Sequence, residues 1–364
     1  MLFHSSFRKE LARSFGATLI VLVTVVMTMA LIRTLGRAAQ GSFNPSDVLL
    51  VMGYTVLAQL PTLLTMSLFI AIISTVSRMY RESEMVIWFT SGRGLISLMR
   101  PLLRFAWPVF VVVMALALFV LPWSKQKIET MKFQYQKRGD IERIEPGQFQ
   151  ESAGGQRVFF IEKNEPGKQT GSNVFIATTE NGKQTVTSAQ RGRVEQINNE
   201  QFVLLSNGQR LESVVEKSEL KLSEFEEYGV RVRTNNLGPN DFAPPNTRLT
   251  VDLIKNPTPP NLSELSWRIG LILAALNFVV IGLAISSVNP RVGRSANLVF
   301  ALLAFVVYYN LLGLGQSWIA SGKMSLASWT LALHGGILVL GSLLLMKEHN
   351  NWHVRSRLFG RSVK

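Results

Sequence analysis

Long apolar runs alternate with polar segments along this chain. Charged residues are absent from residues 15–32, 48–77, 105–121, 269–290 and 295–322, and the run at 324–346 holds one titratable residue, His334. Each run approaches or exceeds the roughly 18–20 apolar residues that a helix needs to cross a bilayer. The pattern predicts a polytopic α-helical membrane protein with six transmembrane helices in a 3+3 layout around a long polar insert.

The first three runs have features beyond their length. The second is too long for one upright span and is expected to tilt or bend, and Pro61 and Pro108 predict kinks in the second and third spans. The first run has a basic leader and is followed by Gly36-Arg37-Ala38-Ala39, which resembles the small-residue cleavage site of a signal peptide. Its uncharged stretch is longer than the 7–15 residues typical of a signal peptide, which favours an uncleaved anchor.

The polar insert has the pattern of a β domain. Between residues 156 and 234, short runs rich in β-branched and aromatic residues alternate with turn signals at Asn181-Gly182, Asn198-Asn199 and Asn207-Gly208. A strand about every ten residues favours a sandwich, jellyroll or barrel. We expect an inserted all-β jellyroll, followed by a return linker at 235–266 that is rich in proline and asparagine.

Alternation along the predicted strands suggests which side chains point inward. A period of two selects Phe159, Phe175 and Val203 as interior residues. These residues could fill a closed core, which is the default for a sandwich, or line splayed sheets that hold an apolar ligand. An open strand edge could also pair with another β protein.

The expected domain boundaries follow from these patterns. Residues 1–122 hold the first three spans and a short cytoplasmic helix near 80–92, and residues 123–266 hold the β domain with its linker. The last three spans occupy 267–346, and a basic tail occupies 347–364.

The distribution of charge predicts the orientation. The net charge is +14, and the segments on the side of the N-terminus carry fifteen lysines and arginines, whereas the short segments on the other side carry three: Arg33, Arg37 and Lys323. The positive-inside rule then places both termini in the cytoplasm and the β domain outside it. Because the excess charge flanks membrane spans, we expect no binding to nucleic acid.

Several kinds of chemistry are missing from the sequence. It has no cysteine, four histidines and no phosphate-binding loop of the G-x-x-x-x-G-K-[ST] type, and the apolar runs lack the acidic and basic residues that ion-coupled transporters use. His349 and His353 are spaced to share a metal, but a surface location in the basic tail is the simpler interpretation. We therefore expect no catalytic residues, no metal and no cofactor in this chain, and dependence on a partner.

The loop after the second span has an unusual composition. As a helix, it would bring Glu84, Met85, Trp88 and Phe89 to neighbouring positions. Such a helix could dock a soluble cytoplasmic subunit, or its aromatic residues could simply rest among lipid headgroups.

Four motifs in this order resemble the lipopolysaccharide export permeases, the LptF/LptG family, over nearly the whole length. The motifs are Tyr80-Arg-Glu-Ser-Glu84, Pro146-Gly-Gln-Phe149, Ser266-Trp-Arg268 and Val288-Asn-Pro-Arg-Val-Gly-Arg294. The last motif and the basic tail look more like the F than the G subunit. The resemblance implies a permease in the bacterial inner membrane that extracts lipopolysaccharide and passes it through its periplasmic jellyroll.

The resemblance also implies partners and site residues. The partners are an ABC ATPase dimer, which binds the ATP and magnesium, a second permease subunit, a periplasmic jellyroll bridge protein and lipopolysaccharide. The helix that couples to the ATPase would comprise Glu82, Glu84, Met85, Trp88 and Phe89. Arg33 would lie near the phosphates of the lipid.

Arg33 and Arg37 also stand out by their own chemistry. They are one helical turn apart and form a basic pair beside the membrane on the side where the short segments carry few bases. Guanidinium groups are well suited to binding phosphates. Their alternative role is that of snorkelling membrane anchors. Two other functions stay open: an ABC-type permease for another lipid or a lipoprotein, and a membrane assembly scaffold without a transport cycle.

Overall fold

The computed structural model describes residues 2–40, 42–92, 94–137, 149–151, 157–162, 171–180, 183–197, 200–214, 219–232, 244–286 and 294–349. The chain divides into two compact units. The first unit comprises Met1–Ala30, Gly53–Gln126 and Ala243–Lys364, and the second comprises Leu31–Met52 and Lys127–Phe242.

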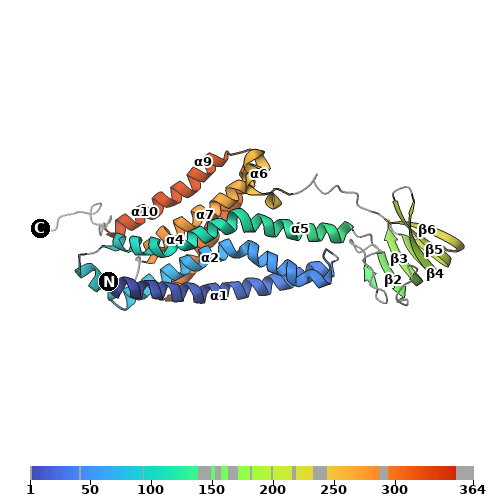
Figure 1. Ribbon diagram of the computed structural model, residues 1–364, viewed down its shortest axis with the longest axis horizontal. Coiled ribbons are helices and arrows are strands. Elements are labelled where there is room, and N and C mark those ends of the chain that lie inside the picture. The colour runs from blue at the N-terminus through green and yellow to red at the C-terminus, as the bar shows by residue number, and fades with distance from the viewer. Residues whose placement is uncertain are drawn as a thin grey trace. The chain divides into compact units, whose positions relative to one another are not determined.

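Six of the described helical stretches are long and apolar enough to cross a membrane, which confirms the six-span prediction. In chain order they are α1 (Leu2–Ala39), α2 (Val48–Arg81), α4 (Met99–Ala115) continuing into α5 (Leu121–Lys137), α7 (Pro259–Ser286), α8 (Arg294–Ala320), and α9 (Leu326–Thr330) continuing into α10 (Gly336–His349) (Figure 1). The strands lie between the third and fourth spans, so the class of a helical membrane protein with an inserted β domain is confirmed.

The helices stay continuous at the two prolines. Pro61 lies inside α2, where its carbonyl accepts a hydrogen bond of 2.9 Å from the Thr65 hydroxyl. Pro108 lies inside α4. The third and sixth spans each contain one π-helical turn, at Leu116–Val120 and Leu331–Gly335, that the sequence pattern did not predict.

Helix α7 is the centre of the first unit. In the most apolar 18-residue stretch of α7, 67% of the residues are buried inside the protein, whereas the corresponding share in α1 is 6%. Phe278 of α7 packs against Phe69 of α2 with ring centroids 4.6 Å apart. A Cβ atom on Gly282 would lie 3.2 Å from both Phe69 and Ile72, so glycine permits the close approach of α2.

A buried polar network joins three spans around α7. The amide of Asn277 donates to the Tyr308 hydroxyl at 2.9 Å and to the carbonyl of His334 at 3.1 Å. The Tyr308 hydroxyl and His334 Nδ1 are hydrogen-bonded at 2.7 Å. The His334 carbonyl belongs to the π-helical turn, so the irregular backbone is bound by a side chain of a neighbouring helix.

The helices extend beyond the expected domain boundaries. Helix α5 continues to Lys137, into the segment expected to be β, and α7 begins at Pro259, inside the expected linker. A further short helix, α6 (Thr250–Lys255), also lies in that linker segment. Proline is favoured in the first turn of a helix, so the prolines taken as linker signals instead open α7.

The described strands form one antiparallel sheet in the order β1 to β6, each strand pairing with the next. They are β1 (Gln150–Glu151), β2 (Arg157–Glu162), β3 (Gly171–Glu180), β4 (Lys183–Ile197), β5 (Glu200–Val214) and β6 (Glu219–Val232). Strands β4 and β5 are each continuous where the sequence pattern predicted two short strands. The expected turn at Asn207-Gly208 lies inside β5, so this prediction is wrong.

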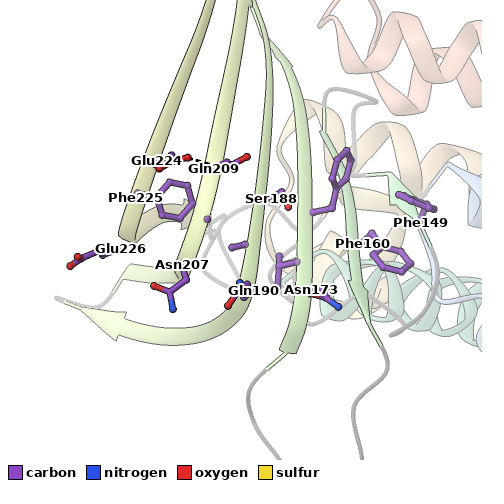
Figure 2. A pocket seen from close by; sticks show the side chains of 14 residues that line it. Phe149, Phe160, Asn173, Ser188, Gln190, Asn207, Gln209, Glu224, Phe225 and Glu226 are labelled. Carbon is purple, nitrogen blue, oxygen red and sulfur yellow. Dashed lines mark hydrogen bonds between the residues drawn. The ribbon is translucent and has the colours of Figure 1, made fainter.

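Asn207 marks a crease in the sheet instead of a turn. Asn173 in β3 and Asn207 in β5 have left-handed φ values of 48° and 55°. They lie on one line across the sheet, because their neighbours Val174 and Gly208 both pair with Ala189 of β4. Left-handed residues bend a strand, and Figure 2 shows a strand turning beside Asn207.

Apolar side chains fill the inner side of the crease. Val174, Ile176 and Leu205 are buried, with exposures of 3%, 4% and 0%. A Cβ atom on Gly192 would lie 2.8 Å from a methyl group of Val174 and 3.4 Å from one of Leu205. The missing side chain at Gly192 therefore leaves the room that the two apolar residues occupy.

A buried ion pair holds the segment before α7. Arg268 and Glu264, one turn apart on α7, are 0% and 2% exposed, and Arg268 Nε donates to Glu264 at 3.0 Å. The other guanidinium nitrogens donate to the Thr250 hydroxyl at 2.7 Å and to the Arg248 carbonyl at 2.9 Å. Arg268 thereby joins α6 and its leading segment to α7.

We expect Arg268→Met to lower the free energy of unfolding by about 3–5 kcal/mol, because it leaves the Glu264 carboxylate buried without its partner. The fall would appear as a lower Tm in detergent. Arg268→Met with Glu264→Gln should recover part of the loss. Lys132→Met removes an exposed ion pair with Glu129 and should change the Tm little. Equal Tm values for the Lys132 and Arg268 variants would contradict the prediction.

Candidate functional site

The loop after α2 contains the short helix expected from the sequence. Helix α2 ends at Arg81, Ser83 adopts a left-handed φ of 57°, and α3 covers Glu84–Thr90. The reversal at Ser83 lets α3 leave the line of α2. The Glu84 carboxylate lies in the first turn of α3, where the helix dipole favours a negative charge.

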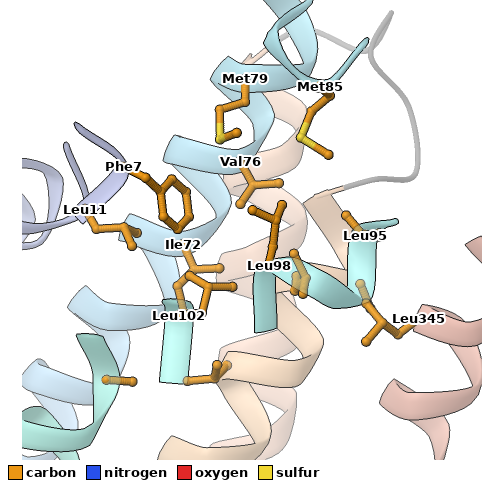
Figure 3. Packing of buried hydrophobic residues seen from close by; sticks show 14 of the residues in the cluster. Phe7, Leu11, Ile72, Val76, Met79, Met85, Leu95, Leu98, Leu102 and Leu345 are labelled. Atoms are coloured by element: carbon orange, nitrogen blue, oxygen red, sulfur yellow. The ribbon is translucent and has the colours of Figure 1, made fainter. Parts of the chain in front are cut away.

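Two residues expected on the docking surface instead anchor α3 to the protein. Met85 and Trp88 are 1% and 5% exposed and belong to a core cluster with Phe7 and Met79. Figure 3 shows Met85 beside Met79, with Phe7 facing α2. The Trp88 indole donates a hydrogen bond of 3.0 Å to Ser97. Their burial corrects the expectation that they form the contact surface, because the inward side of α3 has to cover the ends of the spans.

The exposed side of α3 carries Val86, Ile87 and Phe89, which we call the α3 apolar face. Their exposures are 58%, 72% and 43%. Phe89 was expected in this role, whereas sequence reasoning missed Val86 and Ile87. A signal was present: if Met85 and Trp88 point inward, the residues between them on a helix must point outward.

Acidic residues surround one guanidinium at the base of α3. Arg78, in the last turn of α2, forms ion pairs with Glu10 of α1, with Glu82 and, at 2.9 Å, with Glu84. We call these four residues the Arg78 cluster. Beside it is a cavity of about 520 Å³ whose lining includes Glu10, Glu84 and Ile87. Glu82 and Glu84 were expected here from the sequence, whereas Glu10 and Arg78 were not.

Arg33 and Arg37 both lie on α1 and are exposed. Their spacing of four residues on a continuous helix places the two guanidinium groups on the same side. The structure thus brings together the pair that the sequence analysis selected. Long arginine side chains in this arrangement can hold one anionic group between them.

The sheet carries a groove of about 800 Å³ with aromatic residues in its wall (Figure 2). Phe160, Phe175 and Ser188 pair directly across β2, β3 and β4, so their side chains share one face. Phe149 stacks at this wall, with its ring centroid 4.7 Å from that of Phe160 and 6.2 Å from that of Phe175.

The structure describes the side chain of only one of the three residues expected in the interior of the β domain. Phe175 is partly buried and lines the groove together with Val174, and its two neighbours Val174 and Ile176 are buried more deeply than it is. The side chains of Phe159 and Val203 lie outside the described part of the structure.

Other sequence features also fall outside it. These are the side chain of His349, residue His353, most of the motif ending at Phe149 and all but the last residue of the motif ending at Arg294. Among the side chains that the structure does describe, no group of three or more histidines and carboxylates could hold a metal ion.

Comparison with known proteins identifies the family. Residues 7–347 match the family described as "Lipopolysaccharide export system permease LptF/LptG". The chain is 26% identical to the lipopolysaccharide export system permease protein LptF of Escherichia coli K12 over 327 residues, which is 88% of each chain. LptF of Shigella flexneri matches with the same identity and coverage. The chain therefore belongs to the LptF/LptG family of lipopolysaccharide export permeases.

Proposed function

We propose that this chain is the permease subunit through which an ABC ATPase drives lipopolysaccharide out of the inner membrane. The family match supports the cargo and the membrane role, since it spans residues 7–347. The chain itself has no phosphate-binding loop, so ATP and magnesium would be bound by a separate ATPase dimer. A second, related six-span subunit would complete the membrane part.

The observation that carries the coupling role is the α3 apolar face beside Glu84. Val86, Ile87 and Phe89 project from a helix whose opposite side is fixed in the core by Met85 and Trp88. A rigid helix that presents apolar side chains and a carboxylate suits a groove in a soluble partner, because little ordering is needed on binding. In the proposed orientation α3 lies in the cytoplasm, where the ATPase is.

The opposite end of α1 suits the lipid. With both termini in the cytoplasm, Arg33 and Arg37 lie at the periplasmic end of the first span and contact lipopolysaccharide phosphates. The β domain is then periplasmic, and its aromatic groove receives acyl chains before a jellyroll bridge protein takes them on. Apolar contact with Phe149, Phe160 and Phe175 would offset the removal of acyl chains from the bilayer.

We expect Glu84→Ala, Glu84→Arg and Ile87→Glu to weaken ATPase binding about tenfold or more, because each removes or opposes a central contact of the docking helix. Lipopolysaccharide release driven by ATP would fall in reconstituted vesicles. The Tm of the chain should stay unchanged in Ile87→Glu, because Ile87 is 72% exposed, and should fall only slightly in the Glu84 variants, which lose one partly exposed ion pair with Arg78.

Leu222→Glu is the matched control, because Leu222 is 62% exposed on β6, far along the chain from α3. Release at the wild-type rate from all three α3 variants would remove the coupling role and favour a scaffold. Normal ATPase binding combined with export of another lipid or a lipoprotein would keep the permease and change its cargo.

We expect Arg33→Glu and Arg37→Glu to lower lipopolysaccharide binding, each by several-fold, because a carboxylate repels the phosphates that a guanidinium would bind. The measurement is the amount of lipopolysaccharide that co-purifies with the complex. Arg33→Lys should retain more binding than Arg33→Glu. Lys323→Glu, which changes the base of another short outward segment, is the control. Equal lipid content in all four variants would show that the arginines are only membrane anchors.

A further inference from the structure

One guanidinium connects three elements at the base of α3. Arg78 Nε and Nη2 contact the two carboxylate oxygens of Glu10 on α1. Its Nη1 donates to Glu82 and, at 2.9 Å, to Glu84, and Nη2 lies 3.4 Å from the second oxygen of Glu84. Helices α1 and α3 are therefore held by the same side chain of α2.

Helix α1 packs only lightly along its span. Only 6% of the residues in its most apolar 18-residue stretch are buried, whereas the corresponding share in α2 is 50%. Near its N-terminus, however, Phe7 and Leu11 are buried in the same core cluster as Met85 and Trp88. Glu10 lies between these two residues, so the ion pair strengthens the attachment of α1 where that helix approaches α3.

The charges of the Arg78 cluster mean that the attachment of α1 to α3 requires an arginine at position 78. Three carboxylates face one cation, so loss of the cation leaves mutual repulsion between Glu10, Glu82 and Glu84. A guanidinium offers five N–H donors in a fixed plane, whereas a lysine ammonium is a point charge with three. Lysine would supply the same single positive charge but could not hold Glu10 with two nitrogens while also binding Glu84.

We propose that Arg78 is a positioning residue that makes α1 follow α3, so that a displacement of the docking helix reaches the span that carries Arg33 and Arg37. The proposal rests on the proposed function, because it assigns the route by which ATPase motion reaches the lipid side. Glu10 receives the motion on α1, and Glu84 delivers it from α3. The core contacts of Met85, Trp88 and Phe7 keep the elements adjacent, while the ion pairs fix their register.

The test uses two spin labels in the complete complex with the ATPase. The chain has no cysteine, so Ala12→Cys and Thr90→Cys, both at exposed positions, would place one label on α1 and one on α3. We expect the distance between the labels to be narrowly distributed both without nucleotide and with trapped ATP. Glu10→Gln should broaden the distribution, or shift it between the two nucleotide states.

The functional readout is lipopolysaccharide released per ATP hydrolysed. We expect Glu10→Gln to lower this ratio about fivefold, which is the lower end of the changes in affinity that coupled sites typically cause. ATP hydrolysis and the yield of complex should stay near wild type. Arg78→Lys should give an intermediate ratio. Glu129→Gln is the matched control, because it removes an exposed ion pair on α5 and should change neither readout.

Two results would overturn the proposal: an unchanged label distance and release ratio in Glu10→Gln, or a parallel loss of complex yield and ATP hydrolysis, which would indicate a merely structural role. Failure of the wild-type complex to release lipopolysaccharide would instead count against the proposed function. The label distance in the isolated chain would then still decide whether Glu10 and Arg78 hold α1 to α3.

Discussion

A lipid bilayer offers no hydrogen-bonding partner, so each polar group in a span has to find one within the protein. In this chain two buried polar clusters of that kind meet at α7. Arg268 and Glu264 satisfy each other and fix the segment around α6, and Asn277 joins Tyr308 to the irregular turn at His334. Helix α7 is also the most buried span. The packing of the first unit therefore depends on α7, and the lightly packed α1 is left free to serve another purpose.

That division suits a permease that is driven from outside the membrane. A fixed frame around α7 gives the docking helix a firm base, because Met85 and Trp88 belong to a core cluster that also includes Val279 and Leu283 of α7. A peripheral span such as α1 can move against this frame at little cost, since it gives up few contacts within this chain. The ion pairs of Arg78 then decide whether that movement follows α3.

The sequence was sufficient for features that depend on one dominant force. Apolar runs located the six spans, because insertion into a bilayer depends mainly on hydropathy, and the acidic, aromatic loop located α3. It was insufficient where two forces compete. Asn207-Gly208 favours a hairpin locally, yet pairing with two neighbouring strands keeps β5 continuous and turns the signal into a crease. Met85 and Trp88 suited either docking or anchoring, and only the core around Phe7 distinguishes the two. Glu10 is 68 residues from Arg78, beyond any local pattern.

The position of α7 along the chain has a consequence for biosynthesis. Its residues, 259–286, are translated after every described strand of the β domain. At about 5–20 residues per second, the ribosome needs on the order of ten seconds to proceed from the end of α5 to the end of α7. During that interval the first three spans are inserted without the helix on which their packing depends. We expect newly made chains to depend on insertion factors or chaperones during this delay, and truncated chains that end before α7 to be degraded.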